Sequence, residues 1–317
     1  MLSPTRSSLR ALSLAAVIAN AVIMTTGAAV RLSSSGLGCD DWPKCTRSTL
    51  VAGKVPGQTA LNTAIEFGNR LLNFPLVLIA IAAFIAAWRF SEGGRRRKDL
   101  FWLAAALPAG IVAQAVLGGI LVLAHLNPAL VSAHFMLSIA IVAAAVVFYV
   151  RCGEGDGPVR NLVRADLRLL AAVLTGAVAV MLVAGTVVTG TGPLAGHADT
   201  PRYHLPLEGV TQLHADIGWF LGALTLALLI GVRFGHTPLR VVRLSWLMLV
   251  MLIVQGVMGY IQYFNHLPAG LVWVHVSTSI GVWITVLLLY LATRERITVP
   301  ADAEEAAPAI PERARTR

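Results

Sequence analysis

Eight long apolar segments constrain this chain more than any other feature. Each is close to the ~20 residues that cross a bilayer as a helix, and their apolar residues do not alternate as they would in a barrel strand. Lipid offers the backbone no hydrogen-bond partner, so spanning segments of this kind must be helical. The expected spans are residues 10–30, 63–88, 100–124, 131–150, 169–190, 208–232, 244–264 and 271–292.

Composition supports a membrane protein. Of 317 residues, 56% are hydrophobic and 13% are charged, whereas soluble domains carry about 25% charged residues. The net charge of +9 could indicate a nucleic-acid partner, but its distribution argues for topology instead. With both termini in the cytoplasm, 19 of the 25 Lys and Arg residues fall on the inner side, as the positive-inside rule requires. We expect a multi-pass protein of a bacterial plasma membrane, with no nucleic-acid partner and an uncleaved first span.

The two halves of the chain repeat one another. Residues 114–140 align with residues 255–281 without a gap, with 11 identities in 27 columns. Shared apolar composition would produce scattered Val and Leu matches, but it would not keep two histidines and a glutamine in register. The polar and glycine pairs in register are Gln114 and Gln255, Gly118 and Gly259, His125 and His266, His134 and His275, and Ser138 and Ser279.

This repeat predicts an all-α integral membrane fold in which eight transmembrane helices form two tandem four-helix bundles related by internal duplication. An even number of spans per unit gives both halves the same orientation. The expected units are an N-terminal bundle (1–150), a C-terminal bundle (169–292) and a disordered cytoplasmic tail (293–317) that is rich in Ala, Pro and Glu. The loop 151–168 is the expected boundary between the bundles.

Three histidines lie a few residues inside their helices, near the outer face: His134, His214 and His275. An imidazole in an apolar span needs a partner, which could be the backbone of a neighbouring helix. Facing histidines in a bundle also commonly hold a cofactor, and neutral imidazole suits iron, copper and zinc. Heme is favoured, because copper or zinc would usually recruit further ligands at close spacing. His214 and His275 could then supply both axial ligands of one heme.

The first half departs from this pattern. A weaker match of residues 65–70 with 210–215 places Asn69 where the second half has His214, and asparagine is a poor ligand for heme iron. Glu66 and Arg70 share a helical face with Asn69. They could form an ion pair that lets two charges tolerate the membrane, or they could be functional, as charges in spans usually are. In that reading Arg70 contacts a heme propionate and Glu66 acts as a base.

The first outer loop and the short loops before the histidine helices carry further candidates. Cys39 and Cys45, with five residues between them on the oxidising side, could form a disulfide that is structural or redox-active. Cys152 is expected to be a free thiol on the cytoplasmic side. His125 and His266 are either exposed loop histidines or contacts of heme propionates or a quinone.

Taken together, the segments TGAAVRLSSSGLGCDDWPKC, EFGNR, LVSAHFMLS and LVWVHVSTS resemble the heme A synthase family over roughly residues 10–292. The resemblance implies an oxidoreductase that oxidises the C8 methyl group of heme O to a formyl group in two steps, for cytochrome c oxidase assembly. It further implies heme b bound by His214 and His275, with electrons passing through it to a quinone or another acceptor. Heme O synthase is a possible partner.

The resemblance also implies roles in the first half. Substrate heme O would bind at His134, Asn69 and Arg70, with Glu66 as the catalytic residue. Cys39 and Cys45 would be the family's redox-active or structural pair. Many members carry histidine where this chain has Asn69, and a second cysteine pair in the loop equivalent to 191–207, which here has none.

Two other functions fit the same residues. A di-heme cytochrome b could carry electrons within the quinone pool without catalysis, although the asymmetry between Asn69 and His214 argues against two closed sites. A heme transporter or chaperone is the third reading. A helix broken near mid-membrane would favour it, but the sequence indicates none, since Pro75 and Pro108 are isolated.

Overall fold

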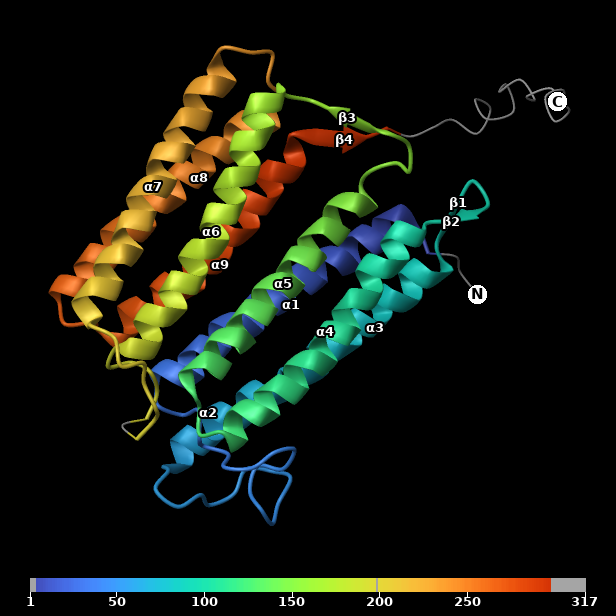
Figure 1. Cartoon of the computed structure of the whole chain (residues 1–317). Coiled ribbons are helices and arrows are strands. Elements are labelled where there is room, and N and C mark those ends of the chain that lie inside the picture. Colours follow the sequence, from blue (N-terminus) through green and yellow to red (C-terminus); the bar gives the residue numbers. More distant parts are fainter. Residues whose placement is uncertain (1–3, 198, 298–317) are drawn as a thin grey trace, which may run out of the picture.

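The computed structural model describes residues 4–197 and 199–297, and these fold into long helices with short connections (Figure 1). Within these residues, eight helical stretches are long and apolar enough to cross a membrane, one of them formed by α2 and α3 together. The expected class and the eight spans are therefore confirmed. The elements are α1 Arg6–Leu32, α2 Ala60–Leu71, α3 Asn73–Arg89, β1 Ser91–Glu92, β2 Arg95–Arg96, α4 Lys98–Leu123, α5 Pro128–Cys152, β3 Val159–Asn161, α6 Ala165–Thr191, α7 Leu207–Arg233, α8 Leu239–Phe264, α9 Ala269–Ala292 and β4 Arg294–Arg296.

Helices α1 to α5 form one group and helices α6 to α9 form another, and the groups lie side by side (Figure 1). They meet where α1 and α5 pack against α9, and where α5 packs against α6. Phe148 on α5 and Ile280 on α9 are almost fully buried, and the indole of Trp283 donates a hydrogen bond to the carbonyl oxygen of Ile139 at 3.0 Å. This seam holds the two groups together.

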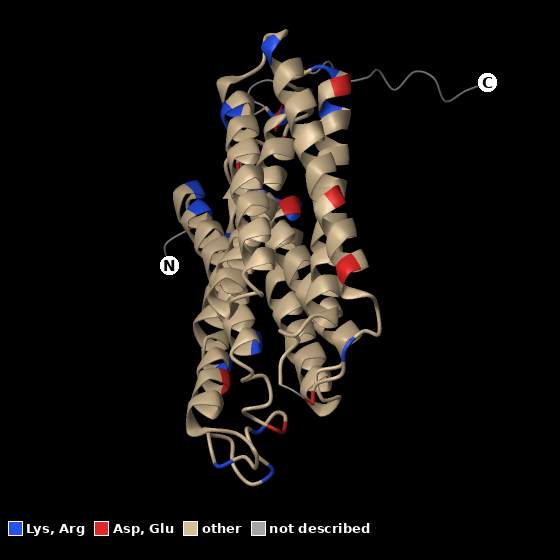
Figure 2. Ribbon diagram, turned by 90° about the vertical axis from the view of Figure 1, so that its left-hand side faces the viewer, with Lys and Arg blue, Asp and Glu red and all other residues tan. Residues whose placement is uncertain are grey.

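Charged side chains gather toward the helix ends, and most of each helix is uncharged (Figure 2). At the end that carries the N-terminus, Arg97 is 4% exposed and binds both Glu92 and Asp99. Arg151 is also buried and binds Asp99 and Glu154. Such pairing lets arginines enter the bundle without leaving an uncompensated charge. The chain is a multi-pass membrane protein, and the cytoplasmic position of its termini stays a prediction.

Helices α4 and α8 end in the same turn. His125 and Leu126 have φ angles of 50° and 60°, and His266 and Leu267 have 60° and 58°. In each turn the amide of the leucine reaches back to a carbonyl five residues earlier, from Leu126 to Leu121 and from Leu267 to Gln262. Consecutive non-glycine residues in the left-handed region are uncommon, so their recurrence at matching positions supports the proposed duplication.

The second span is not one continuous helix. Helix α2 ends at Leu71 and α3 begins at Asn73, so the span expected over 63–88 is present, with an interruption at Leu72. Pro75 explains the break, because proline has no amide hydrogen to donate to Leu71 and its ring crowds the preceding turn. The interruption falls at the thirteenth of the 30 residues in Ala60–Arg89, and Leu72 keeps right-handed helical backbone angles.

The segment after α9 is also more ordered than expected. Strand β4 pairs antiparallel with β3, with Arg160 opposite Glu295, and their side chains form an ion pair. The expected disordered tail therefore cannot begin at residue 293, because this ladder ties the chain end to the loop between the halves. The rest of that prediction, residues 298–317, lies outside the described residues.

Candidate functional site

Each of the four positions singled out as possible ligands faces a glycine on a neighbouring helix. A Cβ atom on Gly118 would lie 3.2 Å from the His134 ring, one on Gly185 3.3 Å from His214, and one on Gly259 3.7 Å from His275. At the fourth position, a Cβ on Gly27 would lie 4.0 Å from the Asn69 amide. Bare backbone thus lets each ligand side chain lie close against the adjacent helix. Sequence reasoning aligned two of these glycines but assigned them no role.

His214 and His275 face one another in the second half. Their ring centres are 6.3 Å apart. A metal bound between two imidazole nitrogens at about 2 Å from each would set the ring centres roughly 6 Å apart. In both rings Nδ1 is buried and has no hydrogen-bond partner within the described structure, so the alternative of a backbone-bonded histidine is not what is seen there. The spacing and the free nitrogens fit a heme held by two histidines.

A glutamine fixes the backbone of two of these histidines. Gln114 donates to the carbonyl oxygen of His134 at 3.0 Å and to Ser138 Oγ at 2.6 Å. Gln255 does the same in the second half, donating to His275 at 3.2 Å and to Thr278 Oγ1 at 2.7 Å. These bonds tie α4 to α5 and α8 to α9 at the depth of the ligands, so the imidazoles are positioned on rigid elements.

The first half places one imidazole and one amide at the matching positions. His134 has a buried Nδ1 without a partner, like the two histidines of the second half. The Asn69 side chain is already engaged, because Thr26 Oγ1 donates to its Oδ1 at 2.7 Å. The one atom with which asparagine could bind iron is therefore held by α1. This half fits a porphyrin bound through His134 and left without a second imidazole.

Glu66 is buried at 6% exposure and both of its oxygens are bound. Arg70 donates to Oε1 at 2.7 Å, and the amide of Cys39 donates to Oε2 at 2.8 Å. Arg70 also donates to the carbonyl oxygens of Asp41 and Lys44, both at 3.0 Å. The ion pair named as the alternative is present, and it anchors the first outer loop. A carboxylate has about four acceptor sites, so these contacts leave Glu66 able to accept a proton.

The expected disulfide joins Cys39 and Cys45, and both sulfurs are buried. The loop it closes lies directly on the first half. Trp42 packs its indole against α4, where a Cβ on Gly119 would come within 2.5 Å of the ring. Gly119 adjoins the glycine that faces His134, so the disulfide loop covers the outer side of this candidate site.

The remaining candidates lie further away. His125 and His266 are exposed in their matching turns, which agrees with loop histidines. Cys152 is a buried free thiol, as expected, at the opposite end of the molecule. Among the described residues there is no group of three or more His, Cys, Asp or Glu side chains arranged to hold a metal ion, so the histidines are not part of a compact zinc or copper cluster.

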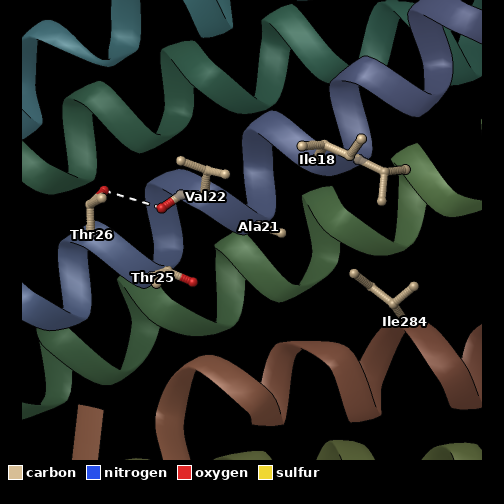
Figure 3. Close-up of a pocket in the computed structure, with 7 residues that line it drawn as sticks. Ile18, Ala21, Val22, Thr25, Thr26 and Ile284 are labelled. Carbon is tan, nitrogen blue, oxygen red and sulfur yellow. Dashed lines mark hydrogen bonds between the residues drawn. The ribbon is translucent and has the colours of Figure 1, made fainter. Parts of the chain in front are cut away.

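An apolar groove reaches the candidate site of the first half along the surface of α1 (Figure 3). It encloses about 280 Å³, and Ile18 and Val22 in it are about half exposed. Thr26 lines one end of the groove and is also the residue that binds Asn69. The full lining is Val17, Ile18, Ala21, Val22, Thr25, Thr26 and Ile284.

A polar ridge on α7, on the side of the helix opposite to His214, was missed by sequence reasoning. Asp216 is exposed although it lies within a spanning helix, and Gln212 donates to its Oδ1 at 2.7 Å. Further along the ridge, Trp219 donates to the hydroxyl of Tyr260 on α8 at 3.2 Å. A carboxylate in a span is expensive and usually functional; that was the signal available in the sequence.

Comparison with known proteins gives one consistent result. The sequence model of the family COX15-CtaA, described as cytochrome oxidase assembly protein, matches residues 10–287. Proteins named heme A synthase from Bacillus mycoides (strain KBAB4), Bacillus cereus (strain AH187) and Bacillus anthracis (strain CDC 684 / NRRL 3495) are each 25% identical to the chain, over 303, 311 and 308 residues. In each case the alignment covers 90% of this chain and 92% of the relative.

Proposed function

The chain belongs to the cytochrome oxidase assembly family that includes the heme A synthases, and we propose that it oxidises the C8 methyl group of heme O to the formyl group of heme A in two steps. The observation that carries the proposal is the asymmetry of the halves. One half presents two facing imidazoles 6.3 Å apart. The other presents His134 and an asparagine whose oxygen is occupied by Thr26, beside a buried carboxylate.

In the second half, His214 and His275 would hold heme b. A heme bound there would supply one-electron transfer between the substrate site and an acceptor. Two imidazoles leave no open position for chemistry, which suits electron transfer. The residues of the chain supply rigidity: Gln255 fixes the backbone at His275, and Gly185 and Gly259 leave room for the rings against α6 and α8.

In the first half, His134 would bind the iron of the substrate heme O. Asn69, held away by Thr26, leaves the other face free of an imidazole. Glu66 would accept a proton released as the methyl carbon is oxidised, a role that contributes about 10²- to 10⁴-fold when the base is well placed. Arg70 holds this carboxylate in place at 2.7 Å and would add positive charge near the propionates. The disulfide loop excludes water from above.

The groove along α1 would take the isoprenoid chain that heme O carries and heme b lacks. It begins at Thr26, next to Asn69, and runs to Val17, a distance of about 13 Å at 1.5 Å per residue. Apart from two threonines its lining is aliphatic or alanine, so it matches an apolar chain in contact with lipid.

Filling this groove should weaken binding of heme O selectively. We expect Val22→Trp to lower the affinity for heme O at least fivefold and to leave heme b in the second half unchanged, as measured by absorbance titration. Ile230→Trp, at an equally lipid-exposed site on α7, is the matched control. Equal heme O affinity in both variants would refute the proposal that the groove binds the isoprenoid chain.

The polar ridge on α7 is the best-supported place for a quinone acceptor. Asp216 and Gln212 offer hydrogen-bonding groups to a ring in the bilayer, and Trp219 and Tyr260 offer aromatic surface. His214 belongs to the same helix, but it lies on the opposite face, because residues two apart on a helix do not face each other. The exposed turns at His125 and His266 lie outside this ridge, and their contact with propionates or a quinone stays a prediction.

Conversion of the substrate tests the proposed function directly. Purified protein supplied with heme O and a quinone should form heme A, detected by mass spectrometry of the extracted pigments. Because the reaction has two steps, a partly oxidised porphyrin should appear before heme A. Failure to form any oxidised product with every acceptor tried would defeat the proposal.

Analysis of the same extracted pigments distinguishes the proposed function from the two alternatives. A di-heme electron carrier would show two equivalent low-spin hemes and no conversion. The orientation of Asn69 by Thr26 speaks against a second closed site. A transporter would bind heme without redox change. The break at Leu72 is a point in its favour, but the local effect of Pro75 accounts for it.

A further inference from the structure

A second groove, remote from the histidines, lies at the opposite end of the helices, where the two halves meet. It encloses about 370 Å³. Tyr149 of α5 contributes from the first half, and Leu239, Arg240, Arg243 and Leu244 of α8 and Leu288 of α9 contribute from the second. We propose that this groove binds one anionic phospholipid, with the phosphate on Arg240 and Arg243 and an acyl chain along Leu244 and Leu288.

Charge is the first argument. Arg240 and Arg243 are three residues apart on one helix, which places their side chains on the same face, and no acidic side chain among the described residues lines the groove. Three acidic side chains at this end are bound elsewhere. Glu92, Asp99 and Glu154 form ion pairs with Arg6, Arg97 and Arg151. Two cations beside an apolar groove thus remain for an anion, and basic pockets between helices on this side of a membrane suit acidic headgroups.

Groups around the groove add to its preference for an anion. Helix α8 begins at Leu239 without a side-chain cap, so the positive end of its dipole adds to the two arginines. Arg10 stacks on Tyr149, with its guanidinium carbon 5.2 Å from the ring centre, and brings a third cation to the edge of the groove. The leucines below continue toward the bilayer interior, which fits a phospholipid and does not fit free phosphate.

Such a lipid would join the two halves. Tyr149 belongs to the first group of helices, whereas both arginines belong to the second. A molecule that contacts all three would add to the seam formed by α5 and α9. The lipid should therefore stabilise the protein as well as bind to it.

Native mass spectrometry of the full-length protein in detergent, with added phosphatidylglycerol or phosphatidylcholine, tests the proposal. We expect one retained phosphatidylglycerol in the wild type and about 30-fold weaker retention in the double variant Arg240→Gln/Arg243→Gln, because each cation near an anionic lipid contributes about a factor of five. Arg89→Gln/Arg233→Gln removes the same charge from exposed helix ends outside the groove and should retain the lipid. An equal loss of bound phosphatidylglycerol in both double variants would refute the proposed lipid site.

Two further measurements distinguish the sources of the anion and do not depend on a variant that folds. Inorganic phosphate should fail to displace the lipid; displacement at millimolar phosphate would show a phosphate site and refute the lipid proposal. Photoactivatable phosphatidylglycerol should label wild-type peptides containing residues 239–244 and Leu288. Labelling spread evenly over the lipid-facing helices would refute it as well. Neither result depends on heme content, so failure here leaves the proposed function untouched.

Discussion

Replacing Glu66 with alanine is expected to abolish oxidation of heme O while heme b stays bound. Glu66 is the one acidic side chain of α2, it is 6% exposed, and it lies one turn before Asn69. Loss of a general base costs about 10²- to 10⁴-fold in rate. The measurement is the rate of heme A formation under single-turnover conditions, with the absorbance of heme b as the check on folding.

Glu66→Ala alone does not separate catalysis from structure, because Glu66 also binds the amide of Cys39 and the guanidinium of Arg70. Glu66→Gln keeps the size of the side chain and one acceptor oxygen for the loop. If Glu66 acts as a base, Glu66→Gln should be as inactive as Glu66→Ala. If Glu66 only anchors the loop, Glu66→Gln should be largely active, and Arg70→Ala should be the more damaging change. If Glu66→Gln forms heme A at a rate within a few fold of wild type, Glu66 is not the base, and its role is the structural ion pair with Arg70.

The fold was predictable where lipid imposes one solution. Apolar stretches of fixed length must be helices in a bilayer, so all eight spans follow from composition and length. The break at Leu72 was not predicted, although Pro75 was in view, because an isolated proline in a span can either kink or interrupt a helix. The pairing of Arg160 with Glu295 joins segments far apart in the chain, and a local pattern in an Ala- and Pro-rich tail carries no signal for it.

The candidate site was predictable where the repeat exposed it. Register alone placed His134 against His275 and Asn69 against His214, and in the structure each of the four faces a glycine of a neighbouring helix. What register could not show was contact between segments outside the repeat. The bonds from Arg70 to the carbonyls of Asp41 and Lys44 depend on how the disulfide loop folds back. The role of Thr26 likewise requires the packing of α1 on α2.

Replacing His275 with alanine should remove heme b from the second half. Removing a residue that merely orients a metal ligand costs about 10- to 100-fold in affinity, so loss of a ligand itself should lower bound heme b by at least that much. The measurement is the heme-to-protein ratio after purification, together with the low-spin absorbance bands. His266→Ala is the control, because it removes a histidine nine residues earlier that is exposed in a turn.

Added imidazole decides whether the loss reflects ligation. A small imidazole fits the space left by the side chain and should restore the low-spin bands in His275→Ala, because Gln255 still holds the backbone at that position. The same treatment should do nothing to His266→Ala. If His275→Ala keeps full heme b with unchanged bands, the 6.3 Å pair is not the ligand set, and the division of the molecule into a closed electron-transfer half and a reactive half fails with it.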